Sequence, residues 1–327
     1  MKNKKNLAMA ALAAVAILTS CSKDKDNEVS KPVEIRLSSA VTPQTRGAHT
    51  EMDVQIPANQ TVAVYVDKAD DTPLYGKTVL TANGSGGFTG TALYFPQSGD
   101  DVNIYAFHTN TDLGANYPTG ELTHTVQTYQ GSQTSYAASD LLYAKTTNVG
   151  KTSSTVTLGF YHLLSKVRIA VRFGAELGDV SDESLGILDS GMTIENTKLG
   201  ATFLPDKTIA ANAVAITATG DVTPILVTNL NSSEISTDFS TGVKYHDAIV
   251  VPQTLREGDK FISIEVYGGS VPELIGTLDY ELPGDITFES GKVYTYHITV
   301  GRTGLTVHSS ITDWDDSPGT VEGRVTL

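Results

Sequence analysis

Alternating apolar and polar positions predict a chain built mostly from β-strands. From Val33 to Val41 every second side chain faces one predicted apolar side, the period of a half-buried strand. The positions on that side are Val33, Ile35, Leu37, Ser39 and Val41. The other strand candidates are Thr61–Val66, Thr91–Phe95, Val102–Phe107, Val156–Phe173, Val214–Ala218, Pro224–Thr228, Ala248–Val251, Phe261–Tyr267, Glu273–Tyr280, Val293–Val300 and Gly304–Ser309. No segment keeps a helical apolar period for three turns, so we expect only short helices, near Ser139–Leu142 or Ala175–Val180.

Turn-forming residues separate these strand candidates and favour antiparallel sheets. Clusters of Gly, Asn, Asp and Pro stand between successive candidates, and Asn83–Gly87 is expected to be a hairpin turn. Strands do not alternate with helices, so the spacing predicts an all-β fold of two tandem antiparallel β-sandwich domains. The Gly-rich, acidic stretch 174–191 has little strand character, which places the domains at residues 32–173 and 174–327.

The N-terminal residues have the pattern of an export signal. Lysine side chains precede an apolar run, Leu7–Leu18, that is shorter than the roughly 20 residues needed to span a bilayer. The run ends in Leu18-Thr19-Ser20-Cys21, which resembles the bacterial lipobox and implies cleavage before Cys21 and lipidation of its thiol. We therefore predict a lipoprotein signal peptide at 1–20 and a flexible tether at 21–31. The alternative is an ordinary secretory signal followed by a chance cysteine.

The chain is acidic, with 23 Lys and Arg against 37 Asp and Glu and a net charge of −14. Removing residues 1–20 takes away three Lys and no acid, so the mature chain carries 20 − 37 = −17. This charge argues against nucleic acid as a partner, because phosphates require clustered Lys and Arg. It also repels anionic lipid, so membrane attachment would depend on acyl chains.

The sequence carries no recognisable catalytic or metal-binding motif. It contains no G-x-S-x-G elbow, no G-x-x-x-x-G-K-[ST] phosphate loop and no H-E-x-x-H zinc motif. The single cysteine excludes an intramolecular disulfide and cysteine-based metal sites. His162 and His297 lie in apolar strand candidates, so we expect structural roles for them, and we expect Trp314 to be buried beside a surface turn. We predict no enzyme activity, no cofactor and no metal site.

Five short motifs, in order along the chain, resemble those of one protein family. They are Asp140-Leu141-Leu142-Tyr143-Ala144, Phe160-Tyr161-His162-Leu163-Leu164-Ser165-Lys166-Val167-Arg168, Val251-Pro252-Gln253-Thr254, Gly291-Lys292-Val293-Tyr294-Thr295-Tyr296 and Ile311-Thr312-Asp313-Trp314. With the lipobox, their order and spacing resemble the fimbrillin-like proteins of Bacteroidales, the type V pilins, over nearly the whole chain.

The resemblance implies assembly into a pilus. Such subunits are two transthyretin-like β-sandwiches, exported as outer-membrane lipoproteins and then assembled into a cell-surface fimbrium. An Arg-specific protease cuts after the first strand, that strand leaves, and an extended segment of another pilin subunit replaces it. Here the matching cleavage site is Arg46-Gly47, directly after Val33–Val41. Because some family members are not cut, Arg46 as an ordinary loop residue remains the alternative.

Strand exchange also has a physical basis that does not depend on the family resemblance. Removing a strand with four apolar inward side chains exposes two unpaired edges, which an incoming strand of the same alternation can refill. The segment 319–327 is a candidate donor, since Val321, Val325 and Leu327 share one face. A plain edge strand of the second domain is the alternative for this segment.

Two further points stay open from the sequence. The sequence does not specify whether the subunit has a stalk, tip or anchor position in the fibre, and it does not specify a host or bacterial surface receptor.

The second functional hypothesis is an outer-membrane lipoprotein that binds surface glycans. Such a protein needs exposed aromatic platforms, for which the chain offers one Trp and 14 Tyr.

Overall fold

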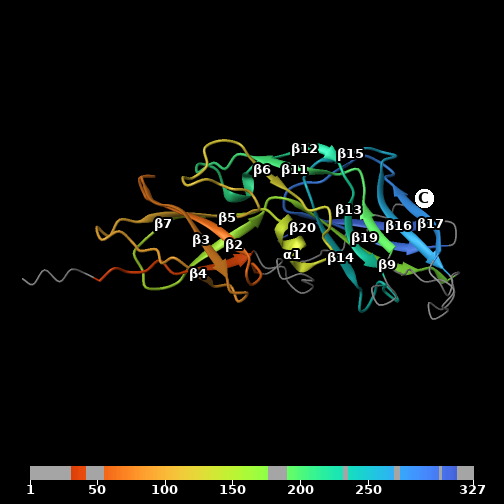
Figure 1. Cartoon of the computed structure of the whole chain (residues 1–327), viewed down its shortest axis with the longest axis horizontal. Helices are drawn as coiled ribbons and strands as arrows, with labels where there is room; N and C mark the ends of the chain where they lie inside the picture. Colours follow the sequence, from red (N-terminus) through yellow and green to blue (C-terminus); the bar gives the residue numbers. More distant parts are fainter. Residues whose placement is uncertain are drawn as a thin grey trace, which may run out of the picture. The chain divides into compact units, whose positions relative to one another are not determined.

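The computed structural model describes residues 31–41, 55–175, 190–230, 235–268, 273–301 and 304–314. β-Strands dominate these residues, with the α-helix α1 (Gln133–Ser139) and the 3-10 helix η3 (Ala211–Ala213) between them (Figure 1). The predicted all-β class is therefore confirmed. Among the described residues, the protein has no helix that is both long enough and apolar enough to cross a membrane.

The largest sheet has seven strands and comes from the first half of the chain. Its order is β1 (Leu37–Val41), β8 (Val156–His162), β7 (Leu142–Val149), β5 (Val102–His108), β2 (Thr61–Lys68), β3 (Pro73–Ala82) and β4 (Phe88–Gly90). β1 runs parallel to β8, and every other neighbouring pair is antiparallel. β1 and β4 are thus the two terminal strands of the hydrogen-bonded order.

The remaining strands form smaller sheets. One four-stranded sheet has the order β13 (Ile225–Leu230), β10 (Ser190–Ile194), β16 (Lys260–Gly268) and β17 (Glu273–Glu281). The other has the order β14 (Tyr245–Val250), β9 (Ser165–Phe173), β19 (Lys292–Val300) and β20 (Leu305–Asp313). A three-stranded sheet contains β12 (Ile216–Val222), β11 (Lys198–Phe203) and β6 (Leu122–Thr125), and β15 (Thr254–Leu255) pairs with β18 (Ile286–Thr287).

The long strand candidate Val156–Phe173 is two strands in different sheets. β8 pairs with β7, whereas β9 pairs with β14 and, in parallel, with β19. The chain changes sheet at Leu163 and Leu164, which are both buried, so the apolar pattern continues across the break. β6 likewise pairs with β11 of the second half. The division into domains at residues 174–191 stays a prediction.

Local turn chemistry explains two more elements. The Asn83–Gly87 turn joins β3 to β4 as predicted, and the Asn83 side-chain oxygen accepts hydrogen bonds from the backbone of Ser85 and Gly87 at 2.8 and 3.0 Å. The sequence predicted a short helix near Ser139–Leu142, whereas helix α1 ends at Ser139. It begins earlier, at Gln133, because the Ser132 side chain caps its N-terminus by accepting a hydrogen bond from the Ser135 N–H. The candidate Thr91–Phe95 forms an isolated bridge at Tyr94 and no strand.

Candidate functional site

The first strand segment is hydrogen-bonded along both of its edges. On one edge β1 pairs with β8 from Leu37↔Val156 to Val41↔Phe160. On the other edge Ile35 N–H donates to the Leu93 carbonyl at 2.8 Å. Segment 33–41 therefore lies between β8 and the segment 86–95, and it joins the two ends of the seven-stranded sheet.

The second edge of this segment is paired at two separate places. At the first place, the Phe95 N–H donates to the Val33 carbonyl at 2.9 Å. At the second, the Ser39 N–H donates to the Gly86 carbonyl at 2.7 Å, and Ser38 forms a bridge with Gly87. The sequence identified this strand and the candidate Thr91–Phe95 separately but not their pairing, which is limited to two short stretches of segment 86–95.

The inward side chains of this segment belong to the protein core. Ile35, Leu37 and Val41 are buried, at 4%, 8% and 1% exposure, and all three lie in the main hydrophobic cluster. Val33 packs against that cluster while partly exposed, and Ser39 is half-buried. Burying three such side chains stabilises the docked strand by about 5–9 kcal/mol before ordering costs are counted.

Between the two paired places the second edge opens into a cavity of about 590 Å³. Residues 34–39 line one side and residues 85–93 the other. Leu80 and Leu93 are buried at this site and Phe88 is half-buried, so part of the lining is apolar. This volume falls in the range of about 300–1,000 Å³ that is typical of small-molecule sites.

A second cluster brings together residues from three of the sequence motifs. His162 Nδ1 lies 2.7 Å from Asp140 Oδ2, and both side chains are buried. The His162 ring stacks on Trp314 with centroids 3.6 Å apart and an angle of 5° between the planes. The predicted structural histidine and buried tryptophan are thus in direct contact, although they are far apart in sequence.

The charge of this pair follows from its surroundings. Burial alone would raise the pKa of the Asp140 carboxyl, but the charge and hydrogen bond of His162 outweigh it and lower that pKa below its usual value. Asp140 is therefore a buried carboxylate, and its hydrogen bond fixes the orientation of the His162 ring against Trp314.

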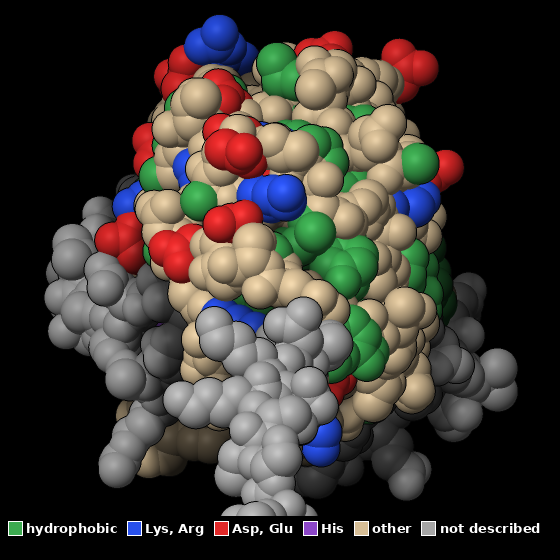
Figure 2. All heavy atoms as spheres, turned by 90° about the vertical axis from the view of Figure 1, so that its left-hand side faces the viewer, with side chains coloured by type: hydrophobic (Ala, Val, Ile, Leu, Met, Phe, Trp, Pro, Cys, Tyr) green, Lys and Arg blue, Asp and Glu red, His purple; other side chains and the backbone are tan. Residues whose placement is uncertain are grey.

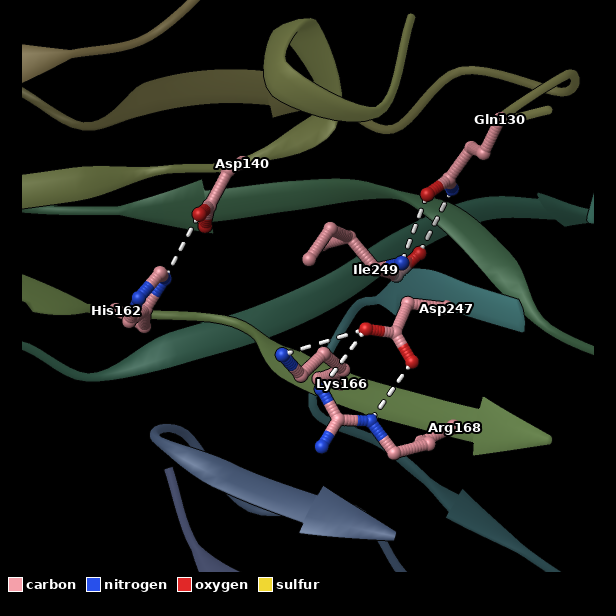
Figure 3. A network of polar contacts seen from close by, with 7 residues as sticks. All are labelled: Gln130, Asp140, His162, Lys166, Arg168, Asp247 and Ile249. Atoms are coloured by element: carbon pink, nitrogen blue, oxygen red, sulfur yellow. Dashed lines mark hydrogen bonds and ion pairs between the residues drawn. The ribbon is translucent and has the colours of Figure 1, made fainter. Parts of the chain in front are cut away.

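The neighbouring strands β9 and β14 add a further buried ion pair (Figure 3). Arg168 donates to both oxygens of Asp247, at 2.9 and 3.0 Å, and Lys166 Nζ lies 3.6 Å from the same carboxylate. Lys166 is fully buried and its ammonium also lies 5.0 Å from the centre of the Trp314 ring. Asp247 belongs to none of the motifs, and only the β9–β14 register reveals it as the partner.

An amide completes this polar core. The side chain of Gln130 accepts from Ile249 N–H at 2.7 Å and donates to the Ile249 carbonyl at 2.9 Å, as Figure 3 shows. Gln130 satisfies backbone groups of β14 as a neighbouring strand would, and its side chain is nearly inaccessible. The contacts of Gln130 with Ile249 and of Arg168 with Asp247 are structural, since these polar groups bond to protein partners inside the core.

His297, the other histidine with a predicted structural role, lies in a separate aromatic cluster. His297 stacks on Phe239 at 4.7 Å and its Nε2 lies 3.2 Å from the Tyr245 hydroxyl. Burial lowers the pKa of His297, which favours the neutral ring.

Among the residues that the structure describes, no group of three His, Cys, Asp or Glu side chains could bind a metal ion.

Several predicted site residues lie outside the described residues. They are the lipidation site Cys21, the cleavage site Arg46-Gly47, and the candidate donor positions Val321, Val325 and Leu327. The roles assigned to these positions stay predictions. The described segment 33–41 ends five residues before Arg46.

Figure 2 shows one face of the molecule in space-filling form. Acidic side chains lie among Lys and Arg side chains, and apolar side chains are exposed in small groups between them. Tyr94 and Tyr129 are among the exposed large side chains of the described residues, at 39% and 44% exposure. Trp314 is fully buried, so the residue best suited to stack on a sugar is inaccessible.

Comparisons with known proteins agree with the motifs. The chain is 25% identical over 327 residues to "Putative fimbrium subunit Fim1C" of Bacteroides uniformis, covering 97% of each protein. Its fold resembles a crystal structure of a "putative cell adhesion protein" from Bacteroides uniformis, with TM-score 0.59 and 20% identity over 87% of this chain and 98% of that one. It also resembles a fimbrial protein from Bacteroides vulgatus, with TM-score 0.50 and 16% identity over 86% and 99% of the two chains. The sequence model of the fimbrillin-like family matches residues 45–314, and the chain therefore belongs to the fimbrillin-like family.

Proposed function

We propose that this protein is a structural subunit of a cell-surface fimbrium or an adhesin associated with it. The fimbrillin-like family consists of structural pilus subunits, so the chain is not an enzyme. The similarity to a fimbrium subunit along 97% of both chains supports a role in assembly with other pilin subunits.

We further propose that the subunit is exported as an outer-membrane lipoprotein and matures by cleavage. Lipidation at Cys21 would attach it to the membrane, because the acidic chain has no electrostatic attraction to anionic lipid. An Arg-specific protease would then cut between Arg46 and Gly47 and separate the lipid-bearing N-terminus from the folded body. A host or bacterial surface receptor is the expected partner of an adhesin in this position.

Assembly by β-strand exchange is the third part of the proposal, and one observation carries it. The segment 33–41 is paired on both edges and buries three apolar side chains, so its departure would leave a groove with two unpaired backbone edges and empty core positions. Such a groove favours capture of another extended chain, because main-chain hydrogen bonds and side-chain pockets are then restored together.

Limited proteolysis of the full chain in detergent tests cleavage and exchange together. We expect trypsin to cut first at Arg46 and the cut protein to form SDS-resistant ladders. Arg46→Lys should still be cut by trypsin but should resist an Arg-specific protease, while Arg46→Ala should resist both. Stable monomers from a protein that is fully cut at Arg46 would refute strand exchange.

The alternative of a glycan-binding lipoprotein gains no specific support. The one Trp is buried, and Tyr94, one of the two exposed tyrosines noted above, contributes its backbone to the bridge with Glu34. Reproducible retardation by one glycan in affinity electrophoresis would favour that alternative.

A further inference from the structure

The two edges of segment 33–41 are held in different ways, and the difference bears on how this segment leaves the sheet. We propose that the segment opens first along its edge with segment 86–95, at the cavity, while it stays paired with β8. We call this first edge the seam. The inference rests on the proposed function, and it adds the order in which the two edges separate.

The edge against β8 is a continuous ladder. Its register pairs run without a break from Leu37↔Val156 to Val41↔Phe160. The ladder extends one residue further, because Val156 N–H donates to the Arg36 carbonyl at 2.8 Å. β8 is seven residues long and is paired with β7 on its other side. This edge therefore has regular pairing and a partner strand that lies inside the sheet.

The seam is interrupted in the middle. Successive residues of a strand direct their N–H and C=O groups to opposite edges. Ile35 and Ser39 both donate their N–H groups to segment 86–95, so the backbone groups of Leu37 between them point to the same side, where the cavity lies. Among the described residues, no backbone hydrogen bond joins Leu37 to segment 86–95. Solvent that enters the cavity thus reaches the middle of the seam.

The partner at the seam is also a smaller element than β8. Segment 86–95 contains β4, which has three residues, ends the order of its sheet and, among the described strands, pairs only with β3. In the described part of the chain, three backbone hydrogen bonds close the seam, with Ile35, Ser39 and Phe95 as donors. Few bonds therefore break when the two segments part, and regions with few, solvent-accessible backbone bonds open most readily.

This order assigns separate requirements to the two edges. The seam can open in the uncut chain, because the segment stays attached to β8 and its ends do not have to be free. Complete departure also breaks the β8 ladder and carries Ile35, Leu37 and Val41 out of the core. Cleavage at Arg46 is then needed for the second step and not for the first.

Hydrogen exchange of the uncut full chain in detergent tests the seam, with single amides resolved by mass spectrometry. Relative to their intrinsic rates, the seam amides of Ile35 and Phe95 should exchange at least tenfold faster than Val156 of the β8 edge. Leu37 should exchange fastest among residues 35–41, because its N–H faces the cavity. Equal protection of the two edges would overturn the proposal.

Two matched disulfides show whether the edges open separately. Both are placed in the Cys21→Ser chain, so that the introduced thiols have no third partner. Glu34→Cys with Tyr94→Cys locks the seam at an exposed antiparallel bridge, where Cα atoms of such a pair lie about 4.5 Å apart, within disulfide reach. Ser38→Cys with Thr157→Cys locks the β8 edge, at a register pair whose hydroxyls lie 3.2 Å apart.

The two locks have different expected effects on the seam. The seam lock should slow exchange at Phe95 at least tenfold, and reduction of the disulfide should restore the original rate. The β8 lock should leave exchange at Phe95 unchanged, because the seam opens while the β8 edge is closed. If the β8 lock slows Phe95 as much as the seam lock does, the segment leaves both partners together and the proposed order is wrong.

The two proposals fail differently. If the seam opens as expected but protein fully cut at Arg46 stays monomeric, strand exchange is refuted and the seam remains a property of the uncut fold. If the cut protein forms SDS-resistant ladders but both edges open together, strand exchange stands and the order of opening is refuted.

Discussion

Replacing Ile35 by Ala should loosen the first strand without changing any other predicted functional residue. Ile35 is 4% exposed, lies in the core cluster, and donates its N–H to Leu93 on the side opposite β8. The substitution keeps the backbone bonds and removes only packing. It therefore isolates the contribution of side-chain burial to docking of the strand.

The expected size follows from the atoms removed. Ile→Ala deletes three buried carbon groups, worth roughly 2.4 kcal/mol at about 0.8 kcal/mol each, and the remaining cavity adds to this. We expect a loss of about 3 kcal/mol from the free energy of unfolding. If the strand still leaves as a unit after cleavage at Arg46, the same loss favours release by about 150-fold.

Two measurements check this prediction. Urea unfolding of the uncut protein should show the loss, and size-exclusion chromatography after proteolysis should show faster appearance of strand-free protein. Ile311→Ala, at a position that is 52% exposed on β20, is the matched control and should change stability by less than about 0.5 kcal/mol. Equal unfolding midpoints for the two variants would refute the packing of Ile35 and with it the magnitude given for the groove.

Three further predictions concern other parts of the chain. Asp140→Ala leaves the His162 ring buried without its carboxylate and should cost about 3–5 kcal/mol in urea unfolding. Burial lowers the pKa of His124 to about 4, below its unfolded value of about 6.5, so the unfolded state binds more protons between these values. Stability should therefore fall by about 3 kcal/mol as pH drops from about 6.5 to about 4, and His124→Gln should remove this slope. Cys21→Ser should move the protein from the membrane fraction to the soluble fraction and abolish palmitate labelling.

Each of these predictions has an outcome that contradicts it. A stability loss below about 1 kcal/mol for Asp140→Ala would mean that the pair with His162 contributes little. An unchanged pH slope in His124→Gln would assign the titration to another group. Membrane attachment of Cys21→Ser equal to that of the native chain would show that another feature anchors the protein.

The sequence predicted strand identity better than strand partners. The alternation in Thr61–Val66 and Val102–Phe107 became β2 and β5, because period-2 burial depends only on local positions. The same pattern cannot show a change of sheet, so Val156–Phe173 was predicted as one strand although it divides at Leu163–Leu164. β3 has an irregular burial pattern and was missed, since much of it is exposed.

In the candidate site, too, the sequence identified residues and only the structure identified their partners. The motifs contain His162, Lys166, Arg168 and Trp314, but they give no reason for these residues to be found together. The structure supplies the reason, because the β9–β14 register brings Asp247 to Arg168 and Lys166, and the break after β8 brings His162 against Trp314.

By itself, the sequence determined the all-β class, the family, the apolar face of segment 33–41 and the acidic charge, because each depends on residue types at short spacing. The tertiary structure decided that this segment joins the two ends of one sheet, that a cavity remains beside it, and that Asp140 meets His162 while Asp247 meets Arg168 and Lys166 in the core. These features depend on residues that are far apart in the sequence, such as Leu37 and Val156 in the β1–β8 pair and Arg168 and Asp247 in the ion pair, and long-range pairing leaves no periodic trace in a single chain.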